Sequence, residues 1–564
     1  MNNQRRLLID DTILILTMAV LAGCGLVYEY LLSHYAGRVL GVMESTIYTM
    51  IGLMIVSMGL GAFAARKIKC PFNGFVWLEV IIALLGCSAI LFIGGAIAVT
   101  QLLPQVVAET FNLPPDAMPR GGLFQSLSWL ALKSPYLFGF LLGFFIGMEI
   151  PLIAKIREIS HQKHLQHNLG TIYGADYIGA GIGAAIWVLF LLAIDISKAG
   201  ALTAALNLLA GTVFIARFWS QLRWRKVLVA LHLCLGLMIL VVYQHGNNWL
   251  NQMNNLLYLD KVVYTDKTRY QQLTFTERNM GLNNDTVINF YLNGRLQFSS
   301  IDEEIYHGYL VYPVLAGSAR HESVLIIGGG DGLALRDVLN WGAQDVTLID
   351  LDSKLLDIFS KPDNYLPEDL ALKISELNEH SLTDPRVDVI AADAFLAIDE
   401  LIAQGKFYDA VLVDLPDPSH PDLNKLYSVN FYARLGQLLS ADGLIGIQST
   451  SPYHAKDSFI AIANTLAAAG FSDVEQYHDN VPSFGEWGWT IGAKSGLSPS
   501  QRLAQLNEMP VQHSWLTLPM MLNAFEFPNG FYRNRSEIGI NYLGSHTIYQ
   551  LHQKAWRDQQ GITQ

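Results

Sequence analysis

The stretch SVLIIGGGDGLALRDVLNWGAQDVTLIDLD (323–352) decides the fold of the second half of this chain. An apolar strand runs into the glycine-rich turn GGGDG (328–332), and the amphipathic segment LALRDVLNW (333–341) follows. A second apolar strand then ends in the acids Asp350 and Asp352. Because an apolar strand, a turn and an amphipathic helix alternate here, the stretch predicts a parallel sheet with helices packed on its faces.

The same pattern continues downstream of this stretch. Three further strands are predicted within VDVIAADAF (387–395), YDAVLVDLPDP (408–418) and GLIGIQS (443–449). We therefore expect a doubly wound, Rossmann-like sheet that binds its ligand at the carboxyl ends of the strands. Upstream, TRYQQLTFTER (268–278) and VINFYLNGRLQF (287–298) alternate apolar and polar residues, which predicts a small antiparallel sheet with its turn at 283–285.

The first half of the chain has a different composition. Residues 1–249 hold 16 Lys and Arg against 11 Asp and Glu, whereas the other 315 residues hold 21 against 38. The 564-residue chain is 51% hydrophobic and 15% charged, with a mean hydropathy of +0.28. These values exclude a disordered protein and argue against a wholly soluble one. The four cysteines, all in the apolar half, lack the spacing of a zinc site or a disulfide framework.

Seven apolar runs are long enough to cross the ~30 Å hydrocarbon core of a bilayer. They predict an α-helical multi-pass membrane domain of about seven helices, followed by a polar connector at 244–258, and the segment 114–132 is a candidate interfacial helix. Gly179 and Gly183, four residues apart, predict close helix packing. We expect the domains 1–245 (transmembrane), 246–322 (linker and antiparallel strands) and 323–564 (Rossmann-like). The predicted spans are 12–34, 44–65, 74–100, 133–154, 170–194, 196–216 and 226–243.

Four acids lie in or near these apolar runs, namely Glu29, Glu79, Glu149 and Asp176. Two interpretations stay open for them. They lie at interfacial depth or bond to neighbouring tyrosines, or they line a path for cations.

Five acids follow four successive strands of the predicted parallel sheet. Because the carboxyl ends of such strands meet at one crevice, the five carboxylates would repel one another there. No Lys or Arg follows these acids in sequence, so an adenosine ligand with a cationic tail fits better than a nucleotide phosphate. Asp350 lies 22 residues after Gly328, the separation at which an acid binds ribose hydroxyls in dinucleotide folds. The five acids are Asp331, Asp350, Asp393, Asp414 and Asp417.

Several motifs together resemble the spermidine synthases, the polyamine aminopropyltransferases, over about 262–555. They are GGGDG (328–332), DLPDP (414–418) with LYSVNFY (426–432), LNGRLQFSSIDEEIYH (292–307) and PSFGEWGW (482–489). The helices ahead of them resemble a bacterial membrane-bound branch of that family. The resemblance implies transfer of the aminopropyl group of decarboxylated S-adenosylmethionine to a polyamine, with release of methylthioadenosine. The conversion that it favours is that of putrescine to spermidine.

The resemblance also implies a role for individual residues. Asp414 corresponds to the proposed general base, which would take a proton from the attacking amine. Tyr306, His307 and Asp417 correspond to residues around the acceptor amine. The donor would be held by Gln271, Gln297, Gly328, Gly330, Asp331, Asp350, Asp393 and Ala394.

This sequence departs from the family pattern on the acceptor side. The usual DSSDP is DLPDP, the Glu that commonly follows the Tyr-His pair is Gly308, and an aromatic position falls on or near Pro482. Putrescine, cadaverine, a longer amine and agmatine therefore all remain open as acceptors.

Two other functions are weighed against this enzyme. One is an S-adenosylmethionine-dependent methyltransferase, although Asp331 would lie against the carboxylate of its donor. The other is a membrane transporter or sensor that only binds polyamine. We expect no metal and no cofactor besides the donor as co-substrate. The expected partners are a polyamine and a lipid membrane, without nucleic acid, in a homo-oligomer (dimer or tetramer).

We expect the chain in the cell (inner) membrane, but two observations predict opposite sides of that membrane for the catalytic half. Positive charges at alternate ends of the spans put the N-terminus in the cytoplasm, so seven crossings would put the catalytic half outside the cell. The donor, however, is a cytosolic metabolite. We therefore expect a cytoplasmic catalytic domain, with one more crossing or a re-entrant segment within 73–132.

Overall fold

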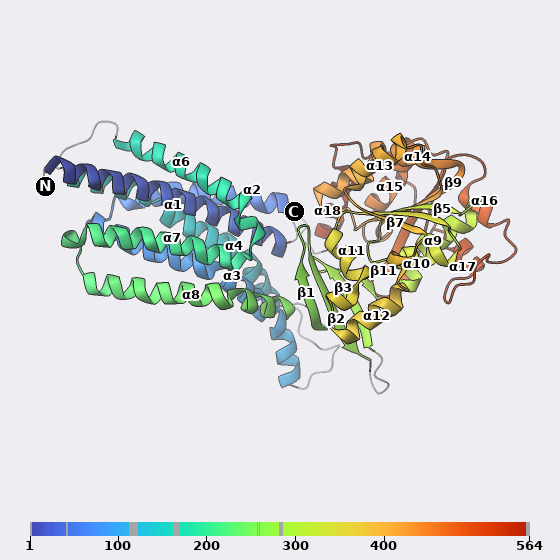
Figure 1. Cartoon of the computed structure of the whole chain (residues 1–564), viewed down its shortest axis with the longest axis horizontal. Helices are drawn as coiled ribbons and strands as arrows, with labels where there is room; N and C mark the ends of the chain where they lie inside the picture. Colours follow the sequence, from blue (N-terminus) through green and yellow to red (C-terminus); the bar gives the residue numbers. More distant parts are fainter. Residues whose placement is uncertain are drawn as a thin grey trace. The chain divides into compact units, whose positions relative to one another are not determined.

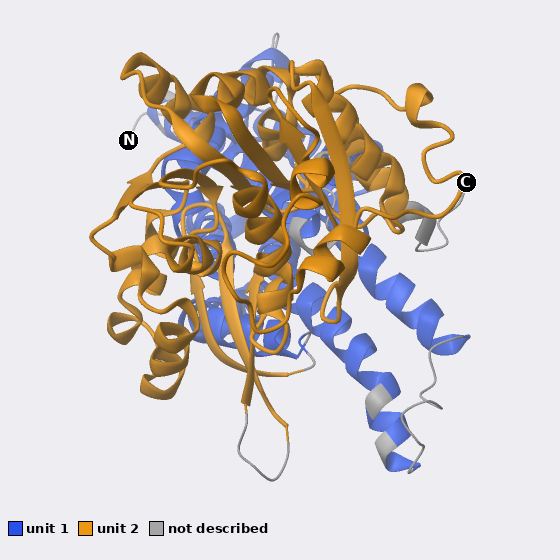
Figure 2. Ribbon diagram, turned by 90° about the vertical axis from the view of Figure 1, so that its right-hand side faces the viewer, with its two compact units in different colours: residues 1–259 blue, residues 260–564 orange. Residues whose placement is uncertain are grey.

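The structure is a computed structural model that describes residues 3–40, 43–111, 122–161, 168–256, 258, 260–280 and 286–559. The chain divides into two compact units, residues 1–259 and residues 260–564 (Figure 2). The first is called the helical unit and the second the α/β unit, and each is described separately below.

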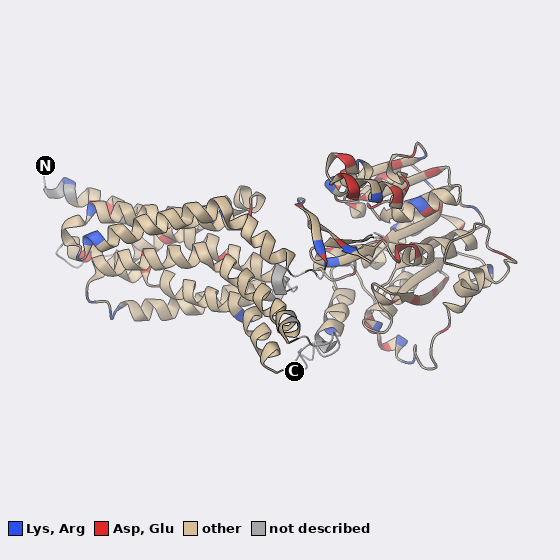
Figure 3. Cartoon of the chain, turned by 90° about the horizontal axis from the view of Figure 1, so that it is seen from below, with Lys and Arg blue, Asp and Glu red and all other residues tan. Residues whose placement is uncertain are grey.

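The described part of the helical unit consists of long helices that carry few charged residues (Figures 1 and 3). Seven stretches are long and apolar enough to cross a membrane, when α4 and α5 are counted as one stretch. The prediction of about seven apolar helices is therefore confirmed. The helices are α1 (Asn3–Leu40), α2 (Met43–Ala65), α3 (Pro71–Thr110), α4 (Leu123–Ile146), α5 (Glu149–His161), α6 (Asn168–Leu189), α7 (Ile196–Arg217) and α8 (Arg225–Asn255).

Small residues let α1 and α6 approach closely. A Cβ atom added to Gly179 would lie 2.0 Å from the carbonyl oxygen of Ala19, and one added to Gly183 would lie 2.5 Å from that of Gly23. Neither distance leaves room for a side chain. The packing role that the sequence predicts for Gly179 and Gly183 is therefore confirmed.

In two places the described helices of this unit extend further than the predicted spans. The connector at 244–258 is helical through Asn255, because Val242, Gly246 and Leu250 continue the buried stripe of α8 at four-residue spacing. The helix expected at 114–132 is not a separate element, since its residues from 123 onward belong to α4 and those before 122 lie outside the described residues. Within 73–132, the described residues form only α3 and the start of α4.

The α/β unit begins with a four-stranded antiparallel sheet in the order β1-β2-β3-β4. The segment 287–298 is a hairpin and not one strand, because Asn293 and Gly294 both adopt positive φ and form a tight turn. The turn expected at 283–285 lies outside the described residues. The strands are β1 (Lys261–Lys267), β2 (Gln272–Asn279), β3 (Thr286–Leu292) and β4 (Arg295–Ser299).

A seven-stranded sheet in the order β10-β11-β9-β8-β5-β6-β7 follows. The five predicted strands β5 to β9 are parallel to one another, and their prediction is confirmed. Strands β10 and β11, which were not predicted from the sequence, add an antiparallel hairpin at one edge. The strands are β5 (Ser323–Gly328), β6 (Asp345–Asp350), β7 (Val387–Ala391), β8 (Tyr408–Asp414), β9 (Leu439–Gln448), β10 (Asp473–Val481) and β11 (Gly485–Ala493).

Helices cover both faces of this sheet (Figure 1). Alternate residues of β5 enter different cores, with Val324 and Ile326 in one and Leu325 and Ile327 in the other. Both faces are therefore buried, which is why the strand is apolar throughout. The helices are α9 (Glu303–Gly317), α10 (Leu333–Asn340), α11 (Ser353–Ser360), α12 (Glu368–Asn378), α13 (Ala394–Ala403), α14 (Val429–Leu438), α15 (Lys456–Ala468), α16 (Pro499–Leu503), α17 (Leu518–Asn523) and α18 (Thr547–Gln559).

The small sheet is attached to the larger one through aromatic packing. Phe275, Phe290 and Phe298 are buried, and each lies near the ring of Phe359 on α11, with ring centroids 5.1–6.2 Å apart. This contact holds the small sheet beside the carboxyl end of β6.

Candidate active site

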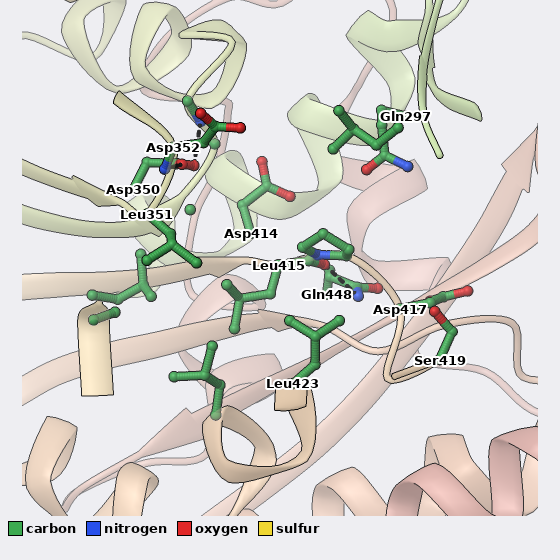
Figure 4. A pocket seen from close by; sticks show the side chains of 18 of the residues that line it. Gln297, Asp350, Leu351, Asp352, Asp414, Leu415, Asp417, Ser419, Leu423 and Gln448 are labelled. Carbon is green, nitrogen blue, oxygen red and sulfur yellow. Dashed lines mark hydrogen bonds between the residues drawn. The ribbon is translucent and has the colours of Figure 1, made fainter. Parts of the chain in front are cut away.

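A cavity of about 890 Å³ lies at the carboxyl ends of the parallel strands β5, β6, β7 and β8. Its walls come from the small sheet, α9, the glycine-rich turn and the segment 414–426. Figure 4 shows Asp350, Asp414 and Asp417 along it, with Gln297 on the opposite side. Every residue named as a site candidate from the sequence lines this cavity: Gln271, Gln297, Tyr306, His307, Gly328, Gly330, Asp331, Asp350, Asp393, Ala394, Asp414 and Asp417.

The glycine-rich turn is held against the end of β8. Gly328 has a φ of +81°, and a Cβ atom there would lie 2.0 Å from the carbonyl oxygen of Asp414. The same carbonyl accepts a hydrogen bond of 3.1 Å from the Gly329 N–H. Glycine is required at position 328 both by its backbone conformation and by this contact.

The ends of β6 and β7 form one end of the cavity. Asp350 accepts hydrogen bonds from the backbone N–H groups of Gly330 (3.2 Å) and Asp352 (2.9 Å). Burial nevertheless raises the pKa of Asp350 to about 6. The Gln271 side chain donates to Asp352 at 3.0 Å, so Asp352 positions this glutamine.

One of the strand-end acids, Asp393, has a basic partner, Lys425, that was not expected from the sequence. Its Nζ lies 2.5 Å from Asp393 Oδ2, although the sequence order suggested no basic partner for the strand-end acids. Asp393 also caps α13 by accepting from the Phe395 N–H. This pair is not evident from the sequence, because Lys425 is 32 residues from Asp393 and is brought back by the 3-10 turn Pro421–Tyr427.

A buried histidine supplies a second positive charge. Burial alone would lower the pKa of His307, but its 2.8 Å contact with Glu303 outweighs this and raises the pKa to about 9. Burial would raise the pKa of Glu303, but His307 and Arg336 lower it to about 2. His307 is therefore an imidazolium at neutral pH, and its charge acts on both Asp331 and Asp414.

Asp331 and Asp414 are the acids nearest to this charge. Burial raises the pKa of Asp331 to about 6, the Asp414 charge adds to the shift and His307 opposes it. Burial also raises the pKa of Asp414, while His307 and a hydrogen bond from Tyr306 lower it. That bond runs 2.7 Å from the Tyr306 hydroxyl to Asp414 Oδ1. Asp414 Oδ2 is turned toward Gly329, since a Cβ atom there would lie 3.2 Å from it.

The loop that follows Asp414 is fixed by two buried side chains. Gln448 donates to the carbonyl of Leu415 at 2.6 Å, and the Tyr427 hydroxyl donates to the carbonyl of Pro416 at 3.0 Å. These bonds hold Asp417 at the cavity. One carboxylate oxygen of Asp417 is buried and has no hydrogen-bond partner among the described residues, and the other lies 3.4 Å from His552 of α18.

Two of the three departures from the family pattern named above, Gly308 and the position near Pro482, differ in their distance from the cavity. Gly308 does not line it, and a Cβ atom there would lie 2.9 Å from Nε2 of His513, whose ring fills the space. Near Pro482, the aromatic wall is supplied by Phe484 and Trp487, which lie beside the Tyr306 ring at 5.9 and 6.4 Å.

The cavity as a whole combines carboxylates with an aromatic wall. An elongated cation would find anionic groups along it and apolar rings beside its methylene groups. A buried carboxylate with a raised pKa is also suited to take a proton from an amine near neutral pH.

Comparisons with known proteins agree with this description. The Spermine/spermidine synthase domain matches residues 303–503. A polyamine aminopropyltransferase of Shewanella oneidensis is 58% identical, and the match covers 98% of this chain and 96% of that protein. Polyamine aminopropyltransferase 1 of Streptomyces coelicolor is 31% identical over 97% of this chain and 95% of its own length. A solved spermidine synthase in complex with the transition state analogue AdoDATO is 20% identical, with a TM-score of 0.42 over 49% of this chain and 90% of that one.

Proposed function

This chain belongs to the polyamine aminopropyltransferases, and we propose that it transfers the aminopropyl group of decarboxylated S-adenosylmethionine to putrescine. The products would be spermidine and methylthioadenosine. The observation that carries the proposal is the arrangement of Asp331, Asp414 and Asp417 along one cavity, because donor and acceptor are both cations with primary ammonium groups.

The donor would occupy the end of the cavity near β6 and β7. Asp350, fixed by two backbone N–H groups, would accept from the ribose hydroxyls, and Asp393 with the Ala394 backbone would contact the adenine amine. Asp331 would bind the ammonium of the aminopropyl tail. An intact S-adenosylmethionine would place a carboxylate near Asp331, and the two negative charges would repel each other.

The acceptor would lie between Asp414 and Asp417, beside Phe484 and Trp487. Asp417 has a buried oxygen without a partner among the described residues, and this oxygen would bind the distal ammonium. Asp414 would take a proton from the attacking amine at Oδ2, because its Oδ1 already accepts from Tyr306. A C–N bond then forms as the C–S bond of the sulfonium breaks, and methylthioadenosine leaves.

A product assay tests this reaction against the two alternatives. Full-length protein is incubated with decarboxylated S-adenosylmethionine and, in turn, putrescine, cadaverine, agmatine and spermidine, and the products are identified by mass spectrometry. The proposal expects methylthioadenosine and spermidine, formed fastest with putrescine. Faster product formation with another amine would identify that amine, and not putrescine, as the acceptor. S-adenosylhomocysteine formed from intact S-adenosylmethionine would indicate a methyltransferase, and no product from either donor would indicate a binding protein.

We further propose that the seven apolar stretches of the helical unit cross a lipid membrane. Their length and apolar composition support this, and large side chains such as Leu233 and Phe63, 71% and 69% exposed, need an apolar surrounding. Resistance of the chain to alkaline extraction from the membrane fraction tests the proposal, and release into the soluble fraction would contradict it.

We propose that the α/β unit faces the cytoplasm, where its donor is made. Seven crossings then place the N-terminus on the outer side, against the distribution of loop charges. Reporters fused after Gln564 decide between these arguments. A bright fluorescent protein supports the proposal, whereas alkaline phosphatase activity with a dark fluorescent protein shows that the unit is periplasmic.

A further inference from the structure

A group of polar side chains lies buried inside the helical unit, among residues that do not line the cavity described above. Glu79 of α3 is 0% exposed, Asn207 of α7 is 1% exposed and His232 of α8 is 7% exposed. Glu149, at the start of α5, is 1% exposed. No Lys or Arg in the described part of this unit forms an ion pair with either glutamate. Buried carboxylates are costly without a compensating positive charge.

The hydrogen bonds of Glu79 leave one of its oxygen atoms free. Asn207 Nδ2 donates to Glu79 Oε2 at 3.0 Å. Glu79 Oε1 is buried and has no partner among the described residues. Because Oε2 already accepts a hydrogen bond, Oε1 is the oxygen that would carry a proton in the neutral acid.

The hydrogen bonds of His232 determine which ring nitrogen is basic. Nδ1 lies 2.9 Å from the carbonyl oxygen of Leu228, and a carbonyl can only accept, so Nδ1 carries a hydrogen. Nε2 of the neutral ring therefore has a free lone pair. This nitrogen is buried and has no hydrogen-bond partner among the described residues.

Gly211 lies between the histidine nitrogen and the glutamate. A Cβ atom added to Gly211 would lie 2.8 Å from His232 Nε2 and 3.3 Å from Glu79 Cβ. The unpaired nitrogen is thus directed at the space beside the Glu79 side chain. A larger residue at position 211 would occupy that space and separate the two groups.

Further acidic side chains lie near Glu79 and Glu149. Helix α1 contributes Cys24 and Tyr28, which lie within the electrostatic range of Glu79 and Glu149. The Tyr28 hydroxyl and one oxygen of Glu149 are also buried without a partner among the described residues. Asp176 of α6 is a further carboxyl group near Glu149. A positively charged ligand or bound protons would neutralise these carboxyl groups.

We propose that Glu79 and His232 form a proton-binding site inside the helical unit. Glu79 Oε1 and His232 Nε2 are not hydrogen-bonded to each other in the structure, so a side-chain rotation first brings them together. The O–H bond at Glu79 Oε1 then breaks and an N–H bond forms at His232 Nε2, leaving a carboxylate beside an imidazolium, and Glu149 is the neighbouring acid that exchanges protons with the pair. The inference rests on the proposal that the helical unit spans a membrane. Such a site would couple proton movement to a second process in the membrane.

The donor atoms of the site favour a proton over a metal ion. Within the described residues, no group of three or more His, Cys, Asp or Glu is arranged to hold a metal. Zn²⁺ is bound by about four such ligands and Ca²⁺ by about six to eight oxygen atoms. The pair instead offers one hydroxyl donor and one nitrogen acceptor, as a proton transfer requires.

Chemical labelling of the full-length protein in membrane vesicles tests the proposal. Dicyclohexylcarbodiimide reacts with protonated carboxyl groups in apolar surroundings, and peptide mass spectrometry locates the adduct. An exposed glutamate with an ordinary pKa is only about 0.2% protonated at pH 7. We therefore expect labelling of Glu79 at pH 7 to exceed that of Asp195, a half-buried carboxylate that forms an ion pair with Lys198, about 100-fold. Equal labelling of the two carboxylates would overturn the proposal.

Infrared spectra of the same vesicles give an independent measurement. The carbonyl band of a protonated carboxyl group should disappear in Glu79→Gln, and its pH dependence should shift in His232→Gln. The controls Asp195→Asn and His245→Gln, the latter exposed on the same helix, should leave the band unchanged. A band unaffected by both site variants would overturn the proposal.

Two checks separate this result from the earlier proposals. Methylthioadenosine release by each variant reports an intact α/β unit, because no substituted residue lies at its cavity. Alkaline extraction is performed first, and a chain absent from the membrane would overturn this inference together with the membrane proposal. Where Glu79→Gln fails to fold, labelling of the wild-type chain across pH decides the question alone.

Discussion

Replacing Asp414 by Asn removes the proposed general base while preserving its shape. The Tyr306 hydroxyl, 2.7 Å from Oδ1, can still donate to the amide oxygen of Asn, so the local structure should persist. The amide nitrogen that replaces Oδ2 cannot accept a proton. We expect turnover to fall about 10²- to 10⁴-fold, the usual contribution of a general base. This corresponds to about 2.7–5.5 kcal/mol in the activation free energy.

The assay is methylthioadenosine release at saturating donor and amine, measured across pH. A base acts only when it is deprotonated, so wild-type activity should fall as the pH decreases through the pKa of Asp414, which burial raises. That acidic limb should be absent from Asp414→Asn. Asp422→Asn is the matched control, because Asp422 lines the same cavity but its side chain is 90% exposed. Turnover of Asp414→Asn within about tenfold of wild type would refute the assignment.

Three further predictions follow from the site. Asp417→Asn should raise the KM for the amine about 10- to 100-fold with little change in kcat, because a charged hydrogen bond worth about 1.5–3 kcal/mol is lost. Gly328→Ala should abolish activity, because its Cβ atom would lie 2.0 Å from the carbonyl oxygen of Asp414. In the control Gly342→Ala, φ is similar but no atom lies within 4 Å of the added Cβ, so only about 1–2 kcal/mol of stability should be lost. The free energy of unfolding should decrease as the pH rises from 6.5 through about 9, because His307 has its pKa raised in the folded state, and Glu303→Gln should remove this decrease.

Each of these has an outcome that would contradict it. A lowered kcat at unchanged KM would show that Asp417 acts in the chemical step. Equal activities of the two glycine variants would mean that contact with the Asp414 carbonyl is unimportant. Urea unfolding midpoints that stay constant between pH 6.5 and 9 would exclude a charged, ion-paired His307.

The sequence was sufficient to predict the parallel strands and their terminal acids. The central residues of β5, β6 and β8 and the second half of β9 are buried, so these strands are largely apolar runs that stop at a turn, whereas the edge strand β7 is only half-buried. β10 and β11 were missed because β11 contains glycine at positions where the neighbouring packing excludes a side chain. A Cβ atom on Gly488, for example, would lie 2.4 Å from the Phe459 ring. Such a contact between distant segments leaves no periodic pattern in one sequence.

The partners of the acids were the part of the site that sequence could not predict. The cavity-lining candidates are recognisable because acids that end parallel strands converge by topology. The pairing of Lys425 with Asp393 and the proximity of His552 to Asp417 depend on how a turn and α18 pack against the sheet. The charge of His307 likewise depends on Glu303, which reaches it from one helical turn away.

Donor choice tests the central claim, which is that buried carboxylates select a cationic donor tail. Isothermal titration compares decarboxylated S-adenosylmethionine with the intact molecule on the full-length protein and on Asp331→Asn. We predict tighter binding of the decarboxylated form by the wild type, and a loss of about 1.5–3 kcal/mol of that binding in the variant, where the ammonium loses its ionic hydrogen bond. Equal or tighter binding of intact S-adenosylmethionine by the wild type would contradict the account.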